Sequence, residues 1–202
     1  MAEFTELLKA LPALIWSLVG AVALWVLRPE LPALLRRIDS VEGAGIKVSL
    51  KALAEAAQLR HVALDLAGPA GARLKDRLER QAKRLAGAEI LWVDDRPSGN
   101  RHEADIFTAL GARITFAAST AEAQGLLAGR PERFDLVLSD WERGDDRNAG
   151  PALLAELRDH ANRTPLVFYV GQDRDLPQGA QDLTRRPDEL VDLVLDALKC
   201  RG

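Results

Sequence analysis

The hydrophobic pattern divides this chain of 202 residues into three regions. From Leu7 to Leu27 nearly every position is apolar, and Lys9 is the only charged residue in that stretch. From Arg28 to Gly87 apolar and charged residues are mixed. After Ala88 short apolar runs alternate with longer stretches in which apolar residues recur every three or four positions. The short runs predict buried strands and the longer stretches predict helices.

The first region has the length and composition of a membrane span. A helix over residues 7–27 would be about 31 Å long, close to the hydrocarbon thickness of a bilayer. Trp25 lies near Arg28, an arrangement typical of a membrane interface, and basic residues are more numerous after the segment than before it. Residues 1–30 are therefore predicted to be a single transmembrane helix in the inner membrane, with the C-terminal domain in the cytoplasm.

Two alternatives compete with this membrane span. A cleaved signal peptide usually begins with basic residues, but Glu3 and Glu6 precede the apolar run, which continues through the cleavage-like sequence at residues 21–23. A buried core helix usually keeps one polar face, which this segment lacks. The sequence favours the membrane span over both.

Residues 31–87 are predicted to form a mostly helical juxtamembrane linker. Gly43 and Gly45 are expected to interrupt the chain. Apolar and polar residues alternate from Ile46 to Lys51, which predicts a short strand. Two helices are expected to follow, over 51–66 and 72–85.

The last region, residues 88–202, is predicted to be an α/β domain with a flavodoxin-like, five-stranded parallel sheet. Strands and helices alternate regularly there, and right-handed crossovers would place helices on both faces of the sheet. The expected strands are 90–93, 113–117, 134–139, 165–170 and 181–184. The expected helices are 100–110, 119–128, 149–160 and 187–199.

Acidic residues follow two of these predicted strands. Asp94 and Asp95 come directly after the first strand, and Asp140 comes after the third. In an open parallel sheet, ligands bind beyond the carboxyl ends of the strands, where the strand order reverses. Three carboxylates brought together there repel one another unless a cation or a proton neutralises them. The sequence therefore predicts a cation site at this edge of the sheet.

Composition narrows the function further. The net charge of -3 gives no reason to expect a nucleic acid as partner. Cys200 is the only cysteine, which excludes an internal disulfide and a cysteine-based metal site and fits a reducing compartment. The sequence contains neither a glycine-rich phosphate loop nor the Gly-x-Ser-x-Gly elbow of a hydrolase.

The stretch from Glu89 to Ala197 resembles the receiver domain of bacterial response regulators. Asp94 and Asp95 match the acidic pair of that family, and Asp140 matches its phospho-accepting aspartate. The family's Gly-Ala-x-Asp…Lys-Pro segment matches Gly179-Ala180-Gln181-Asp182 followed by Arg186-Pro187. The resemblance implies that Asp94, Asp95, Asp140 and the backbone carbonyl of Glu142 hold Mg²⁺. It also implies that Arg186 takes the place of the lysine that pairs with the phosphate.

The sequence also departs from the family's pattern at positions that matter for signalling. Val170 stands where the family has a phosphate-sensing Thr or Ser, and valine cannot donate a hydrogen bond. Arg186 differs from lysine in shape and hydration. The charged loop 141–148 is about two residues longer than usual, by comparison with the family's spacing. Residues 172–178 are too few for the helix that the family carries between its last two strands.

Three functions remain open from the sequence. The favoured one is a membrane-anchored signalling or effector protein whose degenerate receiver-like domain acts through protein–protein contacts, as a homo-oligomer and without enzymatic activity. An alternative is a receiver that takes phosphate on Asp140 from a histidine kinase. A third is a nucleotide- or NAD-cleaving enzyme using Glu142, because residues 139–142 faintly resemble part of Toll/interleukin-receptor-like domains.

Overall fold

The computed structural model describes residues 31–128 and 133–200. Its α-helices are α2 (Leu31–Leu59), α3 (Pro69–Leu85), α4 (Arg101–Thr108), α5 (Thr120–Leu127), α6 (Ala149–Asp159) and α7 (Pro187–Ala197). Its strands are β1 (Glu89–Val93), β2 (Arg113–Ala117), β3 (Leu136–Ser139), β4 (Leu166–Tyr169) and β5 (Asp182–Thr184). Short 3-10 helices cover Pro97–Asn100 and Leu198–Cys200.

The chain divides into two units, Met1–Glu42 and Gly43–Gly202. The predicted transmembrane helix of residues 1–30 lies outside the described residues. Within the described ranges, no helix combines the length and the apolar character needed to cross a membrane.

The five strands form one parallel sheet in the order β2-β1-β3-β4-β5. This order confirms the predicted flavodoxin-like α/β sheet, in which the chain reverses its direction of travel between β1 and β3. All strands and helices predicted after Ala88 are present, with ends that differ by a few residues. In the register of β1 and β3, Val93 lies opposite Ser139. The residues that follow these two, Asp94 and Asp140, therefore leave the sheet side by side.

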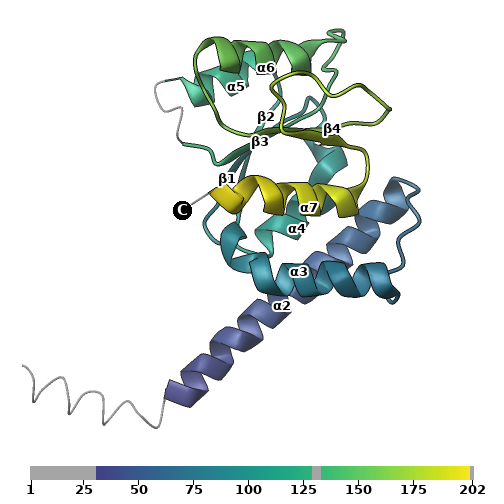
Figure 1. Ribbon diagram of the computed structural model, residues 1–202, viewed down its shortest axis with the longest axis vertical. Coiled ribbons are helices and arrows are strands. Elements are labelled where there is room, and N and C mark those ends of the chain that lie inside the picture. The colour runs from purple at the N-terminus through teal and green to yellow at the C-terminus, as the bar shows by residue number, and fades with distance from the viewer. Residues whose placement is uncertain (1–30, 129–132, 201–202) are drawn as a thin grey trace, which may run out of the picture. The chain divides into compact units, whose positions relative to one another are not determined.

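Helices cover both faces of the sheet (Figure 1), with α5 and α6 on one face and α4 and α7 on the other. Side chains of successive strand residues point to opposite faces. Accordingly, Leu91 and Val93 pack in the cluster that includes residues of α5 and α6, whereas Ile90 and Trp92 pack in the cluster that includes residues of α4 and α7. Burial on both faces explains why the central strands read as continuous apolar runs.

In Figure 1, α3 lies below α7, and the second half of α2 runs obliquely past α3 and ends to the right of α7. Leu53 of α2 and Leu78 of α3 are fully buried in the same hydrophobic cluster as Phe107 of α4 and Leu190 of α7. The hydroxyl of Ser49 donates a hydrogen bond of 2.7 Å to the backbone carbonyl of Ile106. The compact unit Gly43–Gly202 thus includes a helical pair that extends the core of the α/β part.

The predicted strand at residues 46–51 is wrong, because the whole stretch lies inside α2. Its buried positions, Ile46 and Ser49, and buried Leu53 just after it are three and four residues apart, which is the helical spacing. Gly45 does not break the helix either. A Cβ at that position would lie 2.5 Å from the carbonyl oxygen of Ala109, so the glycine allows α2 to approach the end of α4 closely.

The next predicted helix, 51–66, ends earlier than expected, because α2 stops at Leu59. His61 adopts a left-handed conformation with φ 54°, and the Val62 N–H donates to the carbonyl of Ala57 at 2.8 Å. This hydrogen-bond pattern is a Schellman motif, which normally carries glycine or asparagine at the left-handed position. A histidine there gives no recognisable stop signal in the sequence.

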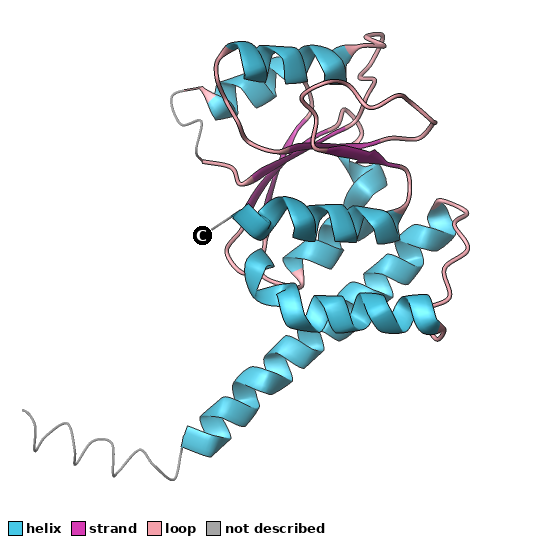
Figure 2. Cartoon of the chain, viewed as in Figure 1, coloured by secondary structure: helices cyan, strands magenta, loops and turns pink. Residues whose placement is uncertain are grey.

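The connection between β4 and β5 contains no helix, as the sequence predicted. Figure 2 shows it as loop from the end of β4 to the start of β5. Phe168 and Val170 are nevertheless buried, and Trp141 packs against Phe168 with ring centroids 5.2 Å apart. The aromatic ring of Trp141 thus covers part of the sheet next to the segment that lacks a helix.

Candidate functional site: an acidic cluster at the ends of β1 and β3

Asp94, Asp95 and Asp140 converge at the carboxyl ends of β1 and β3, as the sequence predicted. One carboxylate oxygen from each residue lies within 4.8 Å of the others. Asp94 is buried, and Asp95 and Asp140 are half-buried. This acidic cluster is what the strand register requires, because the two strand ends are neighbours in the sheet.

Asp94 is held by two hydrogen bonds. The backbone N–H of Arg96 donates to its Oδ1 at 2.6 Å, and the side-chain amide of Asn100 donates to its Oδ2 at 2.5 Å. Two donors on the two oxygens fix the plane of the carboxylate. The remaining lone pairs of Asp94 are therefore presented in a fixed direction.

Asp95 is less completely bonded than Asp94. The backbone N–H of Gly144 donates to its Oδ2 at 2.8 Å. Its buried Oδ1 accepts no hydrogen bond from the residues that the structure describes, and it forms an ion pair of 3.7 Å with the Nε of exposed Arg96. Buried polar atoms nearly always have a hydrogen-bond partner, so a buried carboxylate oxygen that accepts no hydrogen bond beside two other acids fits a cation ligand.

Asp140 accepts a hydrogen bond of 2.6 Å on Oδ1 from the backbone N–H of Trp141. Burial raises the pKa of this carboxyl, and the charges of Asp94 and Asp95 raise it further. The Trp141 hydrogen bond and the charge of Arg143 oppose that rise in pKa. The charged form of Asp140 is thus disfavoured, which is the condition that a bound divalent cation would relieve.

Arg143 is the residue near the cluster that sequence reasoning missed. It is 7% exposed, and burial lowers the pKa of its guanidinium while the neighbouring aspartates raise it. Its guanidinium donates to the hydroxyls of Ser139 and Thr120, both at 2.9 Å, and to the carbonyls of Asp140 and Ala149 at 3.0 and 2.6 Å. The arginine therefore ties the charged loop 141–148 to the end of β3. Its sequence neighbours are charged and glycine residues, so nothing in the pattern marks it as buried.

Arg186, the residue directly before α7, forms ion pairs with two acids of that helix. Its guanidinium contacts Asp188 at 2.8 Å and Glu189 at 3.3 Å, at the start of α7. Val170, the residue at the sensing position, is 2% exposed. The hydroxyl and the free cation that would contact a phosphoryl group are therefore missing from these two positions.

Glu142 takes part in a contact between two loops. Its side chain pairs with Arg174 of the β4–β5 connection, and the guanidinium of Arg174 lies 5.6 Å from the ring centroid of Trp141. The helix-free connection is thus anchored on the residue that directly follows Asp140.

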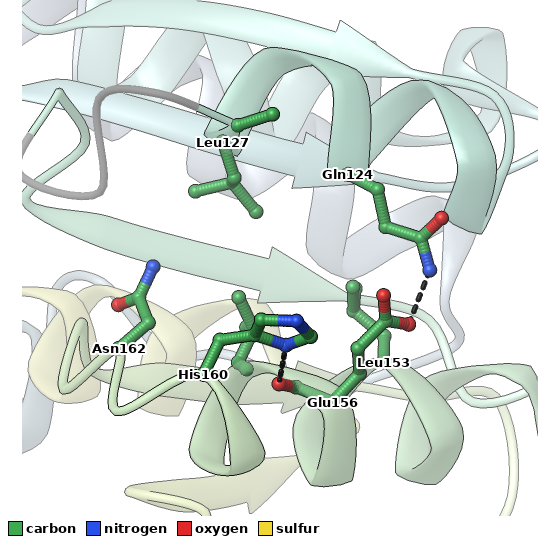
Figure 3. A pocket seen from close by; sticks show the side chains of 8 residues that line it. Gln124, Leu127, Leu153, Glu156, His160 and Asn162 are labelled. Atoms are coloured by element: carbon green, nitrogen blue, oxygen red, sulfur yellow. Dashed lines mark hydrogen bonds between the residues drawn. The ribbon is translucent and has the colours of Figure 1, made fainter.

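A cavity of about 410 Å³ opens beside the acidic cluster and is lined by Asp95, Thr120 and Arg143. A different cavity, of about 300 Å³, lies between α5 and α6 (Figure 3). Leu127, Leu153 and His160 are among the residues that line the second cavity, which contains none of the three clustered aspartates. Of these two cavities, only the first adjoins the acidic cluster.

The donor set suits a hard divalent cation. Mg²⁺ prefers carboxylate, carbonyl and water oxygens, and it is usually held by one or two protein carboxylates. The carboxylates of Asp95 and Asp140 meet that requirement within one cluster. Whether the carbonyl of Glu142 takes part stays a prediction.

No protein-family model and no curated protein matches this chain significantly. Among solved structures, the Francisella response regulator 1452 receiver domain is 23% identical over 57% of this chain and 100% of that one, with a TM-score of 0.50. The receiver domain of the hybrid histidine kinase CckA is 23% identical over 55% of this chain and 100% of that chain, with a TM-score of 0.47. A CheY-like receiver domain protein from Methanospirillum hungatei JF-1 is 21% identical over 58% of this chain and 100% of that chain, with a TM-score of 0.48.

Proposed function

Since the α/β part of the chain has the fold of a response-regulator receiver domain, we propose that it is a signalling or effector module of degenerate type. It binds Mg²⁺ at Asp94, Asp95 and Asp140 and acts through contacts with other proteins. The observation that carries the cation proposal is the cluster of three carboxylates, in which the buried Oδ1 of Asp95 accepts no hydrogen bond from the described residues.

Val170 and Arg186 are the reason to propose that the domain acts through protein–protein contacts and not through a switch driven by phosphorylation. Val170 is buried and carries no hydroxyl, and Arg186 is paired with Asp188 and Glu189. A phosphoryl group on Asp140 would therefore lack both the donor and the cation that the resemblance assigns to these positions. The β4–β5 connection also offers no helix that could move as a unit.

We further propose that residues 7–27 anchor the protein in the inner membrane and that the chain acts there as a homo-oligomer. The support is the length and apolar composition of that segment. Fractionation of cells that produce the full chain tests the anchor. Recovery in the membrane fraction, resistant to high salt and released by detergent, is expected. Complete recovery in the soluble fraction would refute it.

One experiment separates this proposal from its main alternative. Full-length protein in detergent is incubated with a small phosphodonor and Mg²⁺, and its intact mass is recorded. We expect Mg²⁺ to change the fluorescence of Trp141, which adjoins the cluster, and we expect no phosphoryl adduct on Asp140. Asp140→Asn should abolish the Mg²⁺ response, whereas the exposed loop residue Asp145, changed to Asn, serves as the matched control.

The alternative is a receiver that accepts phosphate from a histidine kinase. Its supporting observation is the position of Asp140, a carboxylate nucleophile beside two acids that could hold Mg²⁺ against the incoming phosphoryl group. In that reaction a carboxylate oxygen of Asp140 forms a bond to phosphorus while the bond from phosphorus to the donor breaks. A stoichiometric mass gain that is lost in Asp140→Asn would establish this alternative.

A further inference from the structure

We propose that Arg60 and Asn100 are positioning residues, which couple the docking of the α2 C-terminus to the cation site through Asp94. The inference rests on the proposed cation-binding function, and it adds how that site is regulated. Arg60 directly follows the last residue of α2, and Asn100 ends the short 3-10 helix after β1.

Two consecutive side-chain hydrogen bonds link Arg60, at the end of α2, to the acidic cluster. The Nη2 of Arg60 donates to the Oδ1 of Asn100 at 2.7 Å, and the Nδ2 of Asn100 donates to the Oδ2 of Asp94 at 2.5 Å. Asn100 is 3% exposed and Asp94 is 7% exposed, so water competes little for either bond. The cation site is thus two hydrogen bonds away from the end of α2.

Arg60 dictates which way the Asn100 amide faces. A guanidinium can only donate and a carboxylate can only accept, whereas an amide has one accepting oxygen and one donating nitrogen. With Arg60 in place, the oxygen of Asn100 must face the arginine, and its nitrogen must face Asp94. The flipped amide would place two donors together on one side and two acceptors on the other. Docked Arg60 therefore keeps Asn100 in the orientation that holds the Asp94 carboxylate.

Arg60 also forms an ion pair with a buried acid, Glu103, in the first turn of α4. Glu103 is 1% exposed. Its Oε1 accepts hydrogen bonds from the Nε of Arg60 at 3.3 Å and from the hydroxyl of Tyr169 at 2.7 Å. The guanidinium carbon of Arg60 lies 4.4 Å from the ring centroid of Tyr169. Undocking Arg60 would leave Glu103 charged and buried without this cation, so the docked arrangement has a second, independent support.

Coupling between two sites is reciprocal in free energy. If docked Arg60 preorganises Asp94 for a cation, the bound cation must in turn favour docked Arg60. The cation affinity of the acidic cluster and the docking of Arg60 then depend on the same equilibrium.

The first test measures Mg²⁺ affinity by isothermal titration calorimetry on the full chain. Outer partners of metal ligands typically change affinity by about 10–100-fold when they are removed. We expect a Kd increase in that range for Arg60→Met and for Asn100→Ala, the second of which leaves the Arg60–Glu103 pair intact. Arg101→Met removes the same charge from an exposed neighbouring position and should leave Kd unchanged. An unchanged Kd in Asn100→Ala would overturn the coupling.

The second test looks in the opposite direction. Mg²⁺ should slow hydrogen exchange at residues 56–62, whose amides include the Val62 N–H bonded to Ala57. This protection should be lost in Asn100→Ala. Equal protection in the wild type and in that variant would contradict the coupling, because a merely structural role of Asn100 does not connect α2 to the cation.

The third test needs no cation and separates failure of the coupling from failure of the proposed function. Absence of Mg²⁺ binding to the wild type would overturn the cation function alone. The coupling is then judged from unfolding temperatures of Arg60→Met, Asp94→Asn and the double variant. Their shifts should be non-additive with Asn100 present and additive in an Asn100→Ala background. Additive shifts in both backgrounds would overturn it.

Discussion

Asp140→Asn removes one negative charge from the acidic cluster and changes little else. The asparagine keeps the shape of the side chain, and its oxygen can still accept the hydrogen bond from the Trp141 N–H. In the absence of divalent cations, we therefore expect the variant to be more stable than the wild type. Most single substitutions at half-buried polar positions have the opposite effect.

The magnitude follows from the geometry of the cluster. At the 4.8 Å limit that encloses the ligand atoms, two unit charges repel by about 3.5 kcal/mol in an effective dielectric constant of about 20. Asp140 faces two such neighbours, but Arg143 offsets part of the repulsion and solvent screens part of it. We expect a net gain of about 1–3 kcal/mol in the free energy of unfolding.

The same reasoning fixes the direction of the pH dependence. Burial, with Asp94 and Asp95 adding to it, raises the pKa of Asp140 in the folded state above its ordinary value of 3.8. Between these two pKa values the folded state binds more protons than the unfolded state, so wild-type stability falls as the pH rises through that window. Above the raised pKa the loss of stability is complete, and below 3.8 it is absent. Asp140→Asn should lack this contribution.

The assay is urea unfolding followed by circular dichroism, first with a chelator and then with excess Mg²⁺. The wild type should gain about 2.7 kcal/mol when Mg²⁺ is present at about 100 times its Kd, whereas Asp140→Asn should gain much less. Asp145→Asn, in the same loop but exposed, should behave like the wild type. If Asp140→Asn is no more stable than the wild type in chelator and responds equally to Mg²⁺, the acidic cluster neither repels itself nor binds the cation.

Three further substitutions test the packing that supports the site. Gly150→Ala places a Cβ 2.6 Å from the backbone oxygen of Asp140 and should lower the free energy of unfolding by about 1–3 kcal/mol; an unchanged urea midpoint would refute that close approach. Leu78→Ala leaves a cavity under α3 and should cost about 2–5 kcal/mol in the same assay; a loss below about 1 kcal/mol would show that α3 is not docked. Ser119→Ala removes the cap that accepts from the Glu122 N–H and should cost about 1 kcal/mol, measured by thermal unfolding, whereas Ser119→Asp should retain most of the stability.

The sheet and its helices could be predicted because local patterns determine them. Strands buried on both faces require apolar runs such as Ile90–Val93, and these runs were recognisable. The convergence of Asp94 and Asp140 is expected if their strands are parallel neighbours, and β1 and β3 are indeed adjacent in the sheet. The elements themselves are recognisable from residues close together in sequence, although their pairing in the sheet joins residues far apart in the chain.

The rest depends on such distant contacts, which leave no periodic signal. The sequence around Gly45 suggests a break, because the residue for which this glycine makes room, Ala109, is far away in the chain. Ser49 is polar but buried, because its hydroxyl bonds the carbonyl of Ile106, whereas apolar Val48 is exposed. The apolar–polar alternation there therefore resembles a strand although the backbone is helical. Arg143 lies in a loop whose charges suggest solvent exposure, yet four oxygen atoms surround its guanidinium.

The contact of Arg174 with Trp141 and Glu142 limits how strongly cation binding at the acidic cluster can affect the β4–β5 connection. Trp141 directly follows Asp140, so the acidic cluster meets the β4–β5 connection through one aromatic ring and no helix has to move. A cation–aromatic contact at an exposed position is worth about 0.5–1 kcal/mol, which corresponds to a change of roughly two- to fivefold in the affinity of a bound partner. If the proposed cation binding acts on a partner through this contact, it would change the partner's affinity only by that modest factor, as a modulator does and an on–off switch does not.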